Sequence, residues 1–418
     1  MSAPTDTVGS ALTTVKKAGS KLSRPQIYLL ISALLLVLFA IRSLTGATDL
    51  TSSGQIGGML GLAVPIGMAG LGGLWSERSG VVNIGLEGMM ILGTFFGAWG
   101  SWHWGPYVGI VLGMAGGALG GALHALVTVT FGVDHVVSGV AINILAPAVT
   151  GYLAKLIFFP VVGSKQSPPL DAPAAITIPW LSPELAKLEA HHWFLVSDLA
   201  GILGALVTDL SIIVVLAVVL FVGTYFLLWK TAFGLRLRSC GENPTAAESL
   251  GVNVYKYKYI AVIVSGAMAG LGGVYMVMVS SSIYQDGQTG GRGYIGLAAM
   301  IFGNWRVGGL AAGAGLFGYT DSLQLRGSDS VHALLIGVAV LLAGIAVRML
   351  LRRSYVAAAL NLVGAGVFAV WFATTKDVPA ELISTTPYVI TLVVLAFASQ
   401  RLRMPAADGI PFRKGQGK

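Results

Sequence analysis

The polar residues that could do chemistry are few and lie inside otherwise apolar stretches. Glu77, Arg78, Asn83 and Glu87 fall close together, and Glu87 comes a few residues into an apolar run. A charge at the centre of a membrane-spanning helix costs about 2.5–3.5 kcal/mol on insertion scales, so such a residue is usually buried against protein or faces a water-filled path. For Glu87 two interpretations stay open: a structural ion pair or hydrogen bond, or a place on a solute pathway.

A second group of polar and aromatic residues lies farther along the chain. Asn143 precedes Pro147, which can kink a helix. Its amide could line a path, or it could simply join two helices, a contact worth about 1 kcal/mol. Trp75 and Tyr275 each follow a glycine-rich motif that occurs twice. The residues that we expect to face a translocation path are Trp75, Asn83, Glu87, Asn143, Tyr275 and Asn304.

The chain lacks the residue patterns of an enzyme or a metal site. Cys240 is the only cysteine, and the six histidines form neither an HxxxH nor an HExxH pattern. The glycines of 313–318 fit GxGxxG, but no strand is expected before them, and the phosphate-binding pattern GxxxxGK followed by Ser or Thr is absent. We therefore predict no catalytic residue, metal or cofactor on this chain. If ATP drives its action, another chain hydrolyses it.

The segment 231–256 contains the best-defined local motif. Asn243 is a good N-cap, Pro244 fits the first helical position and Gly251 fits a C-terminal stop, which predicts a short helix over 244–250. So short a helix is marginal alone in water and needs a partner surface, most simply a soluble subunit. A connector lying on the membrane is the alternative, but such connectors usually have a basic face. The residues that we expect to couple to the partner are Gly241, Glu242, Asn243, Pro244, Ala246, Ala247, Glu248 and Gly251.

The composition places these residues in a bilayer. Of the 418 residues, 55% are hydrophobic and only 11% are charged, whereas soluble domains are about 25% charged. A soluble chain of this kind would expose large apolar patches. The net charge of +8 fits Lys and Arg collecting in cytoplasmic loops, and no basic stripe interleaved with aromatic residues points to nucleic acid. We expect an all-α integral membrane protein.

The apolar runs predict about 10–12 membrane-spanning helices in a domain over 26–400. The stretch 291–304 is short, so it could cross the membrane or form a half-helix. An excess of Lys and Arg on one side places the tails 1–25 and 401–418 in the cytoplasm, together with the coupling loop at about 231–256. The same map has a long outer loop at about 160–207 and two extra helices at about 331–374.

A sequence repeat relates the two halves of the chain. The six residues 68–73 recur identically at 268–273, and the pattern IGLxxM at 84–89 recurs at 295–300. On the expected topology the two copies run in opposite directions, so we predict an inverted repeat around 55–159 and 257–350. Transporters with this plan hold substrate near the midplane, at the interface of the repeats.

These motifs give the chain a family resemblance. It resembles the permease subunits of ATP-binding-cassette importers, in the family that includes simple-sugar, nucleoside and branched-chain amino acid systems. Residues 241–251 are similar to the family's coupling helix, and 77–88, 138–144 and 291–294 resemble its nucleoside and simple-sugar branch. The extra helices at about 331–374 depart from the family pattern.

The resemblance implies an activity and a set of partners. The activity would be passage of a small polar solute, a nucleoside or simple sugar, through a bacterial plasma membrane. The implied partners are a cytoplasmic ATPase that carries ATP and Mg, a second permease that is different or identical, an extracellular or periplasmic binding protein, and membrane lipid. An ion-coupled secondary transporter, which also uses inverted repeats, is the alternative. A membrane enzyme acting on lipid would need a cluster of acids or histidines that the sequence lacks.

Overall fold

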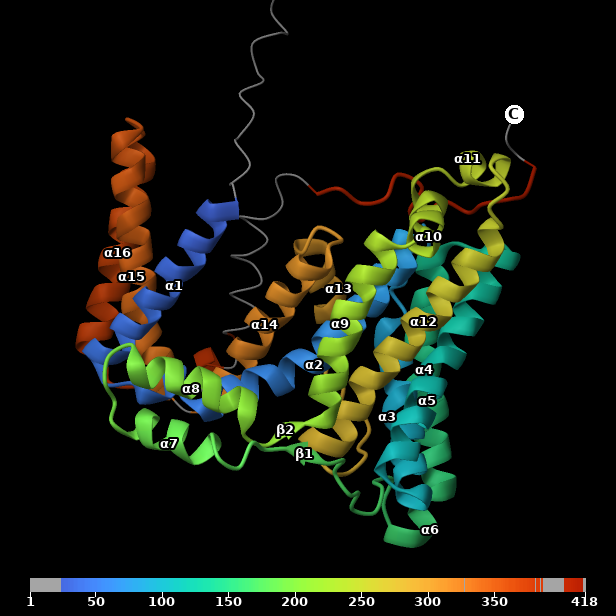
Figure 1. Ribbon diagram of the computed structural model, residues 1–418, viewed down its shortest axis with the longest axis horizontal. Coiled ribbons are helices and arrows are strands. Elements are labelled where there is room, and N and C mark those ends of the chain that lie inside the picture. Colours follow the sequence, from blue (N-terminus) through green and yellow to red (C-terminus); the bar gives the residue numbers. More distant parts are fainter. Residues whose placement is uncertain (1–23, 327, 380, 384, 386–401, 416–418) are drawn as a thin grey trace, which may run out of the picture.

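The computed structural model describes residues 24–326, 328–379, 381–383, 385 and 402–415, and this part of the chain is mostly helical with very little strand. The elements follow one another along the chain (Figure 1) as α1 Arg24–Thr45, η1 Thr48–Thr51, α2 Ser53–Arg78, α3 Leu86–Trp104, α4 Pro106–Ala125, η2 Leu126–Thr130, α5 His135–Ile157, α6 Phe159–Val162, β1 Ala175–Ile176, α7 Ser182–Ala190, α8 Val196–Val207, β2 Leu210–Ser211, α9 Ile212–Lys230, α10 Ala232–Glu242, α11 Pro244–Ser249, α12 Val254–Tyr275, η3 Met276–Ser280, α13 Arg292–Phe302, α14 Val307–Gln324, α15 Ser328–Leu351 and α16 Tyr355–Thr374.

Seven of the described helices are long and apolar enough to cross a membrane, which confirms the predicted all-α membrane fold. They are α2, α4 continued by η2, α5, α9, α12 continued by η3, α15 and α16. With 11 residues, α13 reaches only about 16 Å at 1.5 Å per residue, half of the roughly 30 Å hydrocarbon core. It is therefore a half-helix. The sequence also predicts a membrane span at 385–400, but this stretch lies almost wholly outside the described residues.

Side-chain caps start several of these helices. Ser52 accepts a hydrogen bond from the Gln55 amide at the start of α2, and Asp134, Ser211 and Asn253 cap α5, α9 and α12 in the same way. Such caps satisfy backbone N–H groups that have no partner inside the helix. The chain therefore marks many of its own helix starts locally.

The two copies of the repeated motif meet where α2 crosses α12. Gly72 of α2 lies against the backbone carbonyl of Ser265, and Gly272 of α12 lies against that of Pro65. From Pro65 to Gly72 the position along α2 advances, whereas the contacting position along α12 goes back from Gly272 to Ser265. The two helices therefore run antiparallel. A Cβ atom at Gly72 would overlap the Ser265 carbonyl, which is why the motif needs glycine here.

The packing around this crossing is reciprocal. The helix α4 packs along α12, where Gly117 lies against Gly266, and α14 packs along α2, where Gly318 lies against Met59. In the same way α3 contacts α12 and α13 contacts α2. This exchange of partners between antiparallel copies is the arrangement expected of an inverted repeat.

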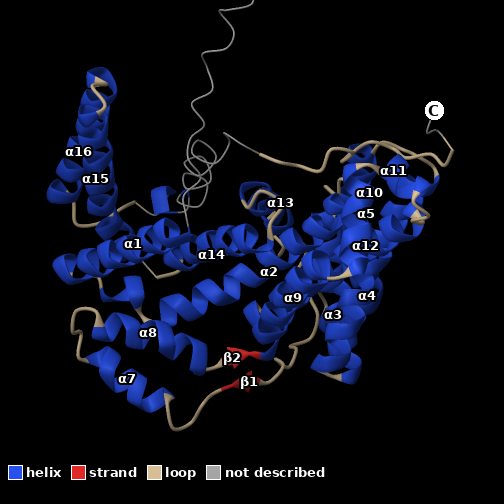
Figure 2. Cartoon of the chain, turned by 45° about the horizontal axis from the view of Figure 1, so that its top comes forward, coloured by secondary structure: helices blue, strands red, loops and turns tan. Residues whose placement is uncertain are grey.

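The reciprocity ends at α5 and α15. The helix α5 packs on α3, whereas α15 packs on α16 and contacts α1. Figures 1 and 2 show α1, α15 and α16 side by side, apart from α3, α4, α5 and α12. The segments at 331–374, which the sequence predicts as extra helices, therefore form helices beside the repeat core.

Two faces of the molecule can be distinguished. On one, α7 and α8 pack on each other, and β1 pairs antiparallel with β2 through Ala175 and Ser211. These elements fill the stretch predicted as a loop at about 160–207. On the opposite face lie α10, α11 and the segment 402–415 (Figure 1). We call these the outer and the inner face, after the sides predicted from the distribution of Lys and Arg.

Candidate functional site

The helix α11 stands at a corner on the inner face. The Asn243 side chain caps it by accepting a hydrogen bond from the Ala246 amide at 3.0 Å, and Pro244 occupies the first helical position. Gly251 has a φ of +81° just beyond the end, where glycine suits the left-handed conformation. The helix covers Pro244–Ser249, one residue less than expected.

Only part of the apolar surface of α11 is buried against the rest of the protein. Ala247 is buried in a small cluster with Cys240 and Val254, whereas Ala246 is exposed and Leu250 is 84% exposed. The spacing of Ala246, Ala247 and Leu250 predicts that they share one face of the helix, but the structure splits them. Ala247 anchors the helix to the protein, and Ala246 with Leu250 presents an apolar surface that the other described residues leave exposed.

The C-terminal segment 402–415 lies across the base of this corner. The Ala407 amide donates to the Gly241 carbonyl at 2.8 Å, and the Ala406 amide donates to Glu242 Oε2 at 3.3 Å. Glu242 Oε1 also lies 3.8 Å from a guanidinium nitrogen of Arg78. The tail, α10 and the inner end of α2 are therefore joined at one place, a contact that the sequence did not reveal.

Inside this junction Asp408 is packed against Glu77. The Asp408 side chain is buried, and its carboxyl forms a hydrogen bond with that of Glu77. Burial raises the pKa of Asp408 to about 7, although Lys258 and Arg78 nearby oppose the rise. The hydrogen bond from Glu77 lowers the pKa of Asp408, so Glu77 is the donor and Asp408 the acceptor, and the two buried carboxyls do not repel each other.

The turn after α13 is bound to the same junction. Trp305 donates its indole N–H to Glu77 Oε2 at 2.6 Å, and its carbonyl accepts from Arg78 at 2.6 Å. Asn304 Oδ1 accepts from the Arg403 amide at 2.7 Å. Asn304, one of the expected path residues, is therefore at the inner end of α13 and in contact with the tail.

Glu87 lies at the other end of α13. Its carboxylate accepts from the Gly291 amide at 3.0 Å and from the Gly293 amide at 2.7 Å. Both N–H groups belong to the N-terminus of α13, where the helix dipole favours a negative charge. This is the structural hydrogen bond that the sequence left open as one of two interpretations. The absence of a side chain at Gly293 lets the backbones approach.

Two asparagines complete this arrangement. Asn143 on α5 accepts from the Gly88 amide at 2.8 Å and donates to the Ile84 carbonyl and the Tyr294 hydroxyl, both at 2.9 Å. Asn83 is buried and donates to the Ser265 hydroxyl at 2.9 Å. The structure thus brings Glu87 and Asn143 together at the facing starts of α3 and α13, with Asn83 in the turn before α3.

The remaining expected path residues lie elsewhere. The Trp75 indole donates to the Thr224 hydroxyl of α9 at 3.0 Å. Tyr275 is buried with its hydroxyl against Gly61 of α2. These residues therefore lie at separate contacts, and their place on a path stays a prediction.

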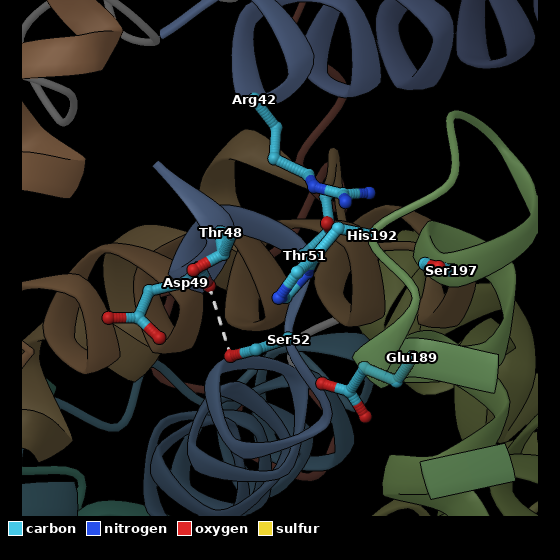
Figure 3. Close-up of a pocket in the computed structure, with 8 residues that line it drawn as sticks. All are labelled: Arg42, Thr48, Asp49, Thr51, Ser52, Glu189, His192 and Ser197. Carbon is cyan, nitrogen blue, oxygen red and sulfur yellow. Dashed lines mark hydrogen bonds between the residues drawn. The ribbon is translucent and has the colours of Figure 1, made fainter. Parts of the chain in front are cut away.

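An outer-face pocket of about 180 Å³ was not expected from the sequence. Figure 3 shows Arg42 on one side of it and Glu189 on the other. Both act structurally: Arg42 pairs with buried Asp198 at 2.7 Å, and Glu189 caps α2 by accepting from the Ser53 amide at 2.8 Å. An arginine ending an apolar run and an aspartate in a distant loop were the only sequence signals.

Comparison with known proteins identifies the family. A family model described as the permease component of branched-chain amino acid transport systems matches residues 55–344. The chain is a member of this permease family. The permease is therefore a multi-pass membrane protein with a transport role rather than an enzyme, in keeping with its apolar helices.

Its relatives agree with this assignment. The permease is 33% identical to the guanosine ABC transporter permease protein NupQ of Bacillus subtilis, over 85% of this chain and 94% of the relative. It is 32% identical to the nucleoside ABC transporter permease protein NupC of Lactococcus lactis, over 86% and 97%. A protein of Haloferax volcanii, TsgC13, provisionally named as a glucose ABC transporter permease, is 31% identical over 85% and 96%. No solved structure matches the permease significantly.

Proposed function

We propose that this permease is the membrane subunit of an ATP-binding-cassette importer for a nucleoside or a simple sugar. The observation that carries the proposal is the similarity, over nearly their whole length, to relatives named for guanosine, nucleoside and glucose transport. The membrane is the bacterial plasma membrane, with both termini in the cytoplasm, because Lys and Arg concentrate on that side of the sequence map.

The partner ATPase binds the inner face at α11. In support, Ala246 and Leu250 are apolar and exposed beside the anchored Ala247. Asn243 caps the helix, Pro244 begins it, and the acidic residues are Glu242 and Glu248. The ATPase supplies ATP and Mg, so this chain needs neither. Coupling residues are Gly241, Glu242, Asn243, Pro244, Ala246, Ala247, Glu248 and Gly251, of which Glu242 acts through its contacts with the tail and Arg78.

A second, different permease completes the path. In support, two permeases of one organism resemble this chain in two cases: NupP beside NupQ in Bacillus subtilis, and NupB beside NupC in Lactococcus lactis. The faces of α5 and α9 that carry exposed apolar residues are then shared between this partner and lipid. A binding protein delivers the solute at the outer face.

The test changes the exposed surface of α11 without touching its anchor. In Ala246→Arg and Leu250→Asp variants the fold should persist, because both side chains are exposed, but ATPase copurification and solute uptake should fall at least tenfold. Leu188→Asp, on α7 of the outer face, is the control and should leave both unchanged. Uptake that persists in both α11 variants without a bound ATPase would favour an ion-coupled transporter instead.

A further inference from the structure

A cavity opens toward the outer face between α3, α5 and the segment 281–291, which leads from η3 into α13. It measures about 150 Å³. Ile91 and Thr94 of α3, Pro147 and Thr150 of α5, and residues 284–289 line it. None of the expected path residues lies here, and no contact described above uses it.

The wall formed by 281–291 is held in place from two sides. Ser167 accepts from the Tyr284 amide at 2.9 Å, and the Leu170 amide donates to the Ser282 carbonyl at 2.8 Å. The Tyr284 ring is buried between Phe95 and Phe158. The wall is therefore a fixed part of the fold, as expected of a pre-formed binding site.

Besides its threonines, the cavity has polar side chains on the wall formed by residues 284–289. The Tyr284 hydroxyl donates to Asp286 Oδ1 at 2.9 Å, and Lys165 lies 3.7 Å from Asp286 Oδ2. Gln288 accepts from the Gln285 amide through its oxygen, while its buried Nε2 has no hydrogen-bond partner among the described residues. An amide nitrogen buried without a partner costs free energy, which a ligand oxygen at this position would recover.

The set suits a neutral solute with neighbouring hydroxyl groups. A carboxylate accepts hydrogen bonds from hydroxyls, and an amide N–H donates to them. Lys165 offsets the charge of Asp286, so the cavity does not select a cation. Ile91 and Pro147 supply an apolar wall. The volume is below the roughly 300–1,000 Å³ of drug-sized ligand pockets, which fits one ring rather than a base and a sugar together.

We infer that this cavity is a substrate subsite on the outer half of the path, in which Asp286 and Gln288 bind the vicinal hydroxyls of a sugar or ribose ring. The inference rests on the proposed function, because it assumes a solute that carries such a ring. The cavity lies just outward of the start of α13, and half-helices at the repeat interface are where transporters of this plan hold substrate.

The first test measures uptake by the complete importer in proteoliposomes with guanosine and ribose. Asp286→Asn and Gln288→Ala should each raise the KM of the transported solute at least tenfold, with the protein still present in the membrane. A dideoxy analogue that lacks the two hydroxyls should be imported poorly by the wild type and no worse by the variants. Glu184→Gln, on the outer helix α7, should behave as the wild type.

The second test does not depend on transport. A cysteine introduced by Gln288→Cys should react with a water-soluble maleimide from outside, and the solute should protect it. The native Cys240 is buried, so it does not compete. Unchanged KM values together with unprotected labelling would overturn the subsite while leaving the importer intact. A wild-type importer that moves neither guanosine, ribose nor any other nucleoside or sugar would overturn the proposed function itself.

Discussion

Glu87 holds the first turn of α13 through two backbone N–H groups. Glu87→Ala would leave both donors without a protein partner in a buried place, and a buried unpaired donor costs about 1–3 kcal/mol. We expect the thermal unfolding temperature of the purified permease to fall clearly, and Glu87→Gln, which keeps one acceptor oxygen, to lie between the two.

The matched control for Glu87 is Glu184→Ala. Glu184 forms an exposed pair with Lys187, and exposed pairs contribute about 0–1 kcal/mol, so its loss should barely change unfolding. If Glu87→Ala unfolded at the wild-type temperature yet stopped transport, the carboxylate would act on the solute instead of capping α13.

Asp408 makes docking of the tail depend on pH. Burial raises its pKa to about 7, from about 3.9 in an exposed chain, so the docked tail binds a proton that the free tail gives up. Docking is then strongest below pH 4, weakens between pH 4 and 7 and is weakest above 7. The groups that face Asp408 are Glu77, Lys258 and Arg78.

Hydrogen exchange of a peptide covering 402–412 measures this dependence. After correction for the intrinsic rate, protection of the Ala407 amide, which bonds the Gly241 carbonyl, should drop from pH 5.5 to pH 7.5. Asp408→Asn removes this titration and leaves Glu77 in place, so its protection should change much less with pH than that of the wild type. An equal slope in wild type and variant would assign the pH response to another group.

Among the elements, α2 contains two glycines with different surroundings, one at its crossing with α12 and one away from it. Gly72 lies against the Ser265 backbone, whereas Gly57 has open space where a Cβ would stand. Gly72→Ala should therefore destabilise the permease by about 1–3 kcal/mol through overpacking. Gly57→Ala should be neutral or slightly stabilising, because alanine favours a helix over glycine. Urea or thermal unfolding of both variants in the same detergent measures the change in stability. Equal changes in Gly72→Ala and Gly57→Ala would contradict close packing at the crossing.

Local chemistry made several of these elements predictable. The cap at Asn243, the proline after it and the stop at Gly251 fixed α11 to within one residue. The identical hexapeptides pointed to the repeat core, because they meet at the α2–α12 crossing. Hydrophobic pattern alone did not separate Ala247 from Ala246, because both are small and apolar and only tertiary packing decides which is buried.

At the scale of the whole molecule, the decisive contacts join residues far apart in sequence. Glu87 reaches Gly291 across 204 positions, and the tail reaches Glu242 across 164. Neither has a local signature, so spacing could not reveal them. The cavity beside Gln288 was missed for the same reason: its walls come from three separate stretches of chain.

The tail links the coupling corner to α13, because it bonds both Gly241 and Asn304. Deleting 402–418 should leave ATPase binding intact, since Ala246 and Leu250 remain, but should raise the ATP hydrolysed per solute imported at least twofold. Deleting 416–418 alone is the control. Both deletions are measured in proteoliposomes. If the longer deletion left the ratio of ATP hydrolysed to solute imported unchanged, the tail would not transmit the coupling between the ATPase and α13.

The glycine contacts between α2 and α12 also bear on how the molecule changes shape. Helices usually lock their crossing angle by fitting ridges of side chains into grooves, but here backbone lies on backbone. Such a contact could serve as a pivot: the two helices would change their crossing angle while the contact between their glycines stays in place. Since α14 packs on α2 and α4 packs on α12, each of these two helices would move together with a helix of the other repeat. A change in the gap between the outer ends of α2 and α12 would then be accompanied by movement of their inner ends.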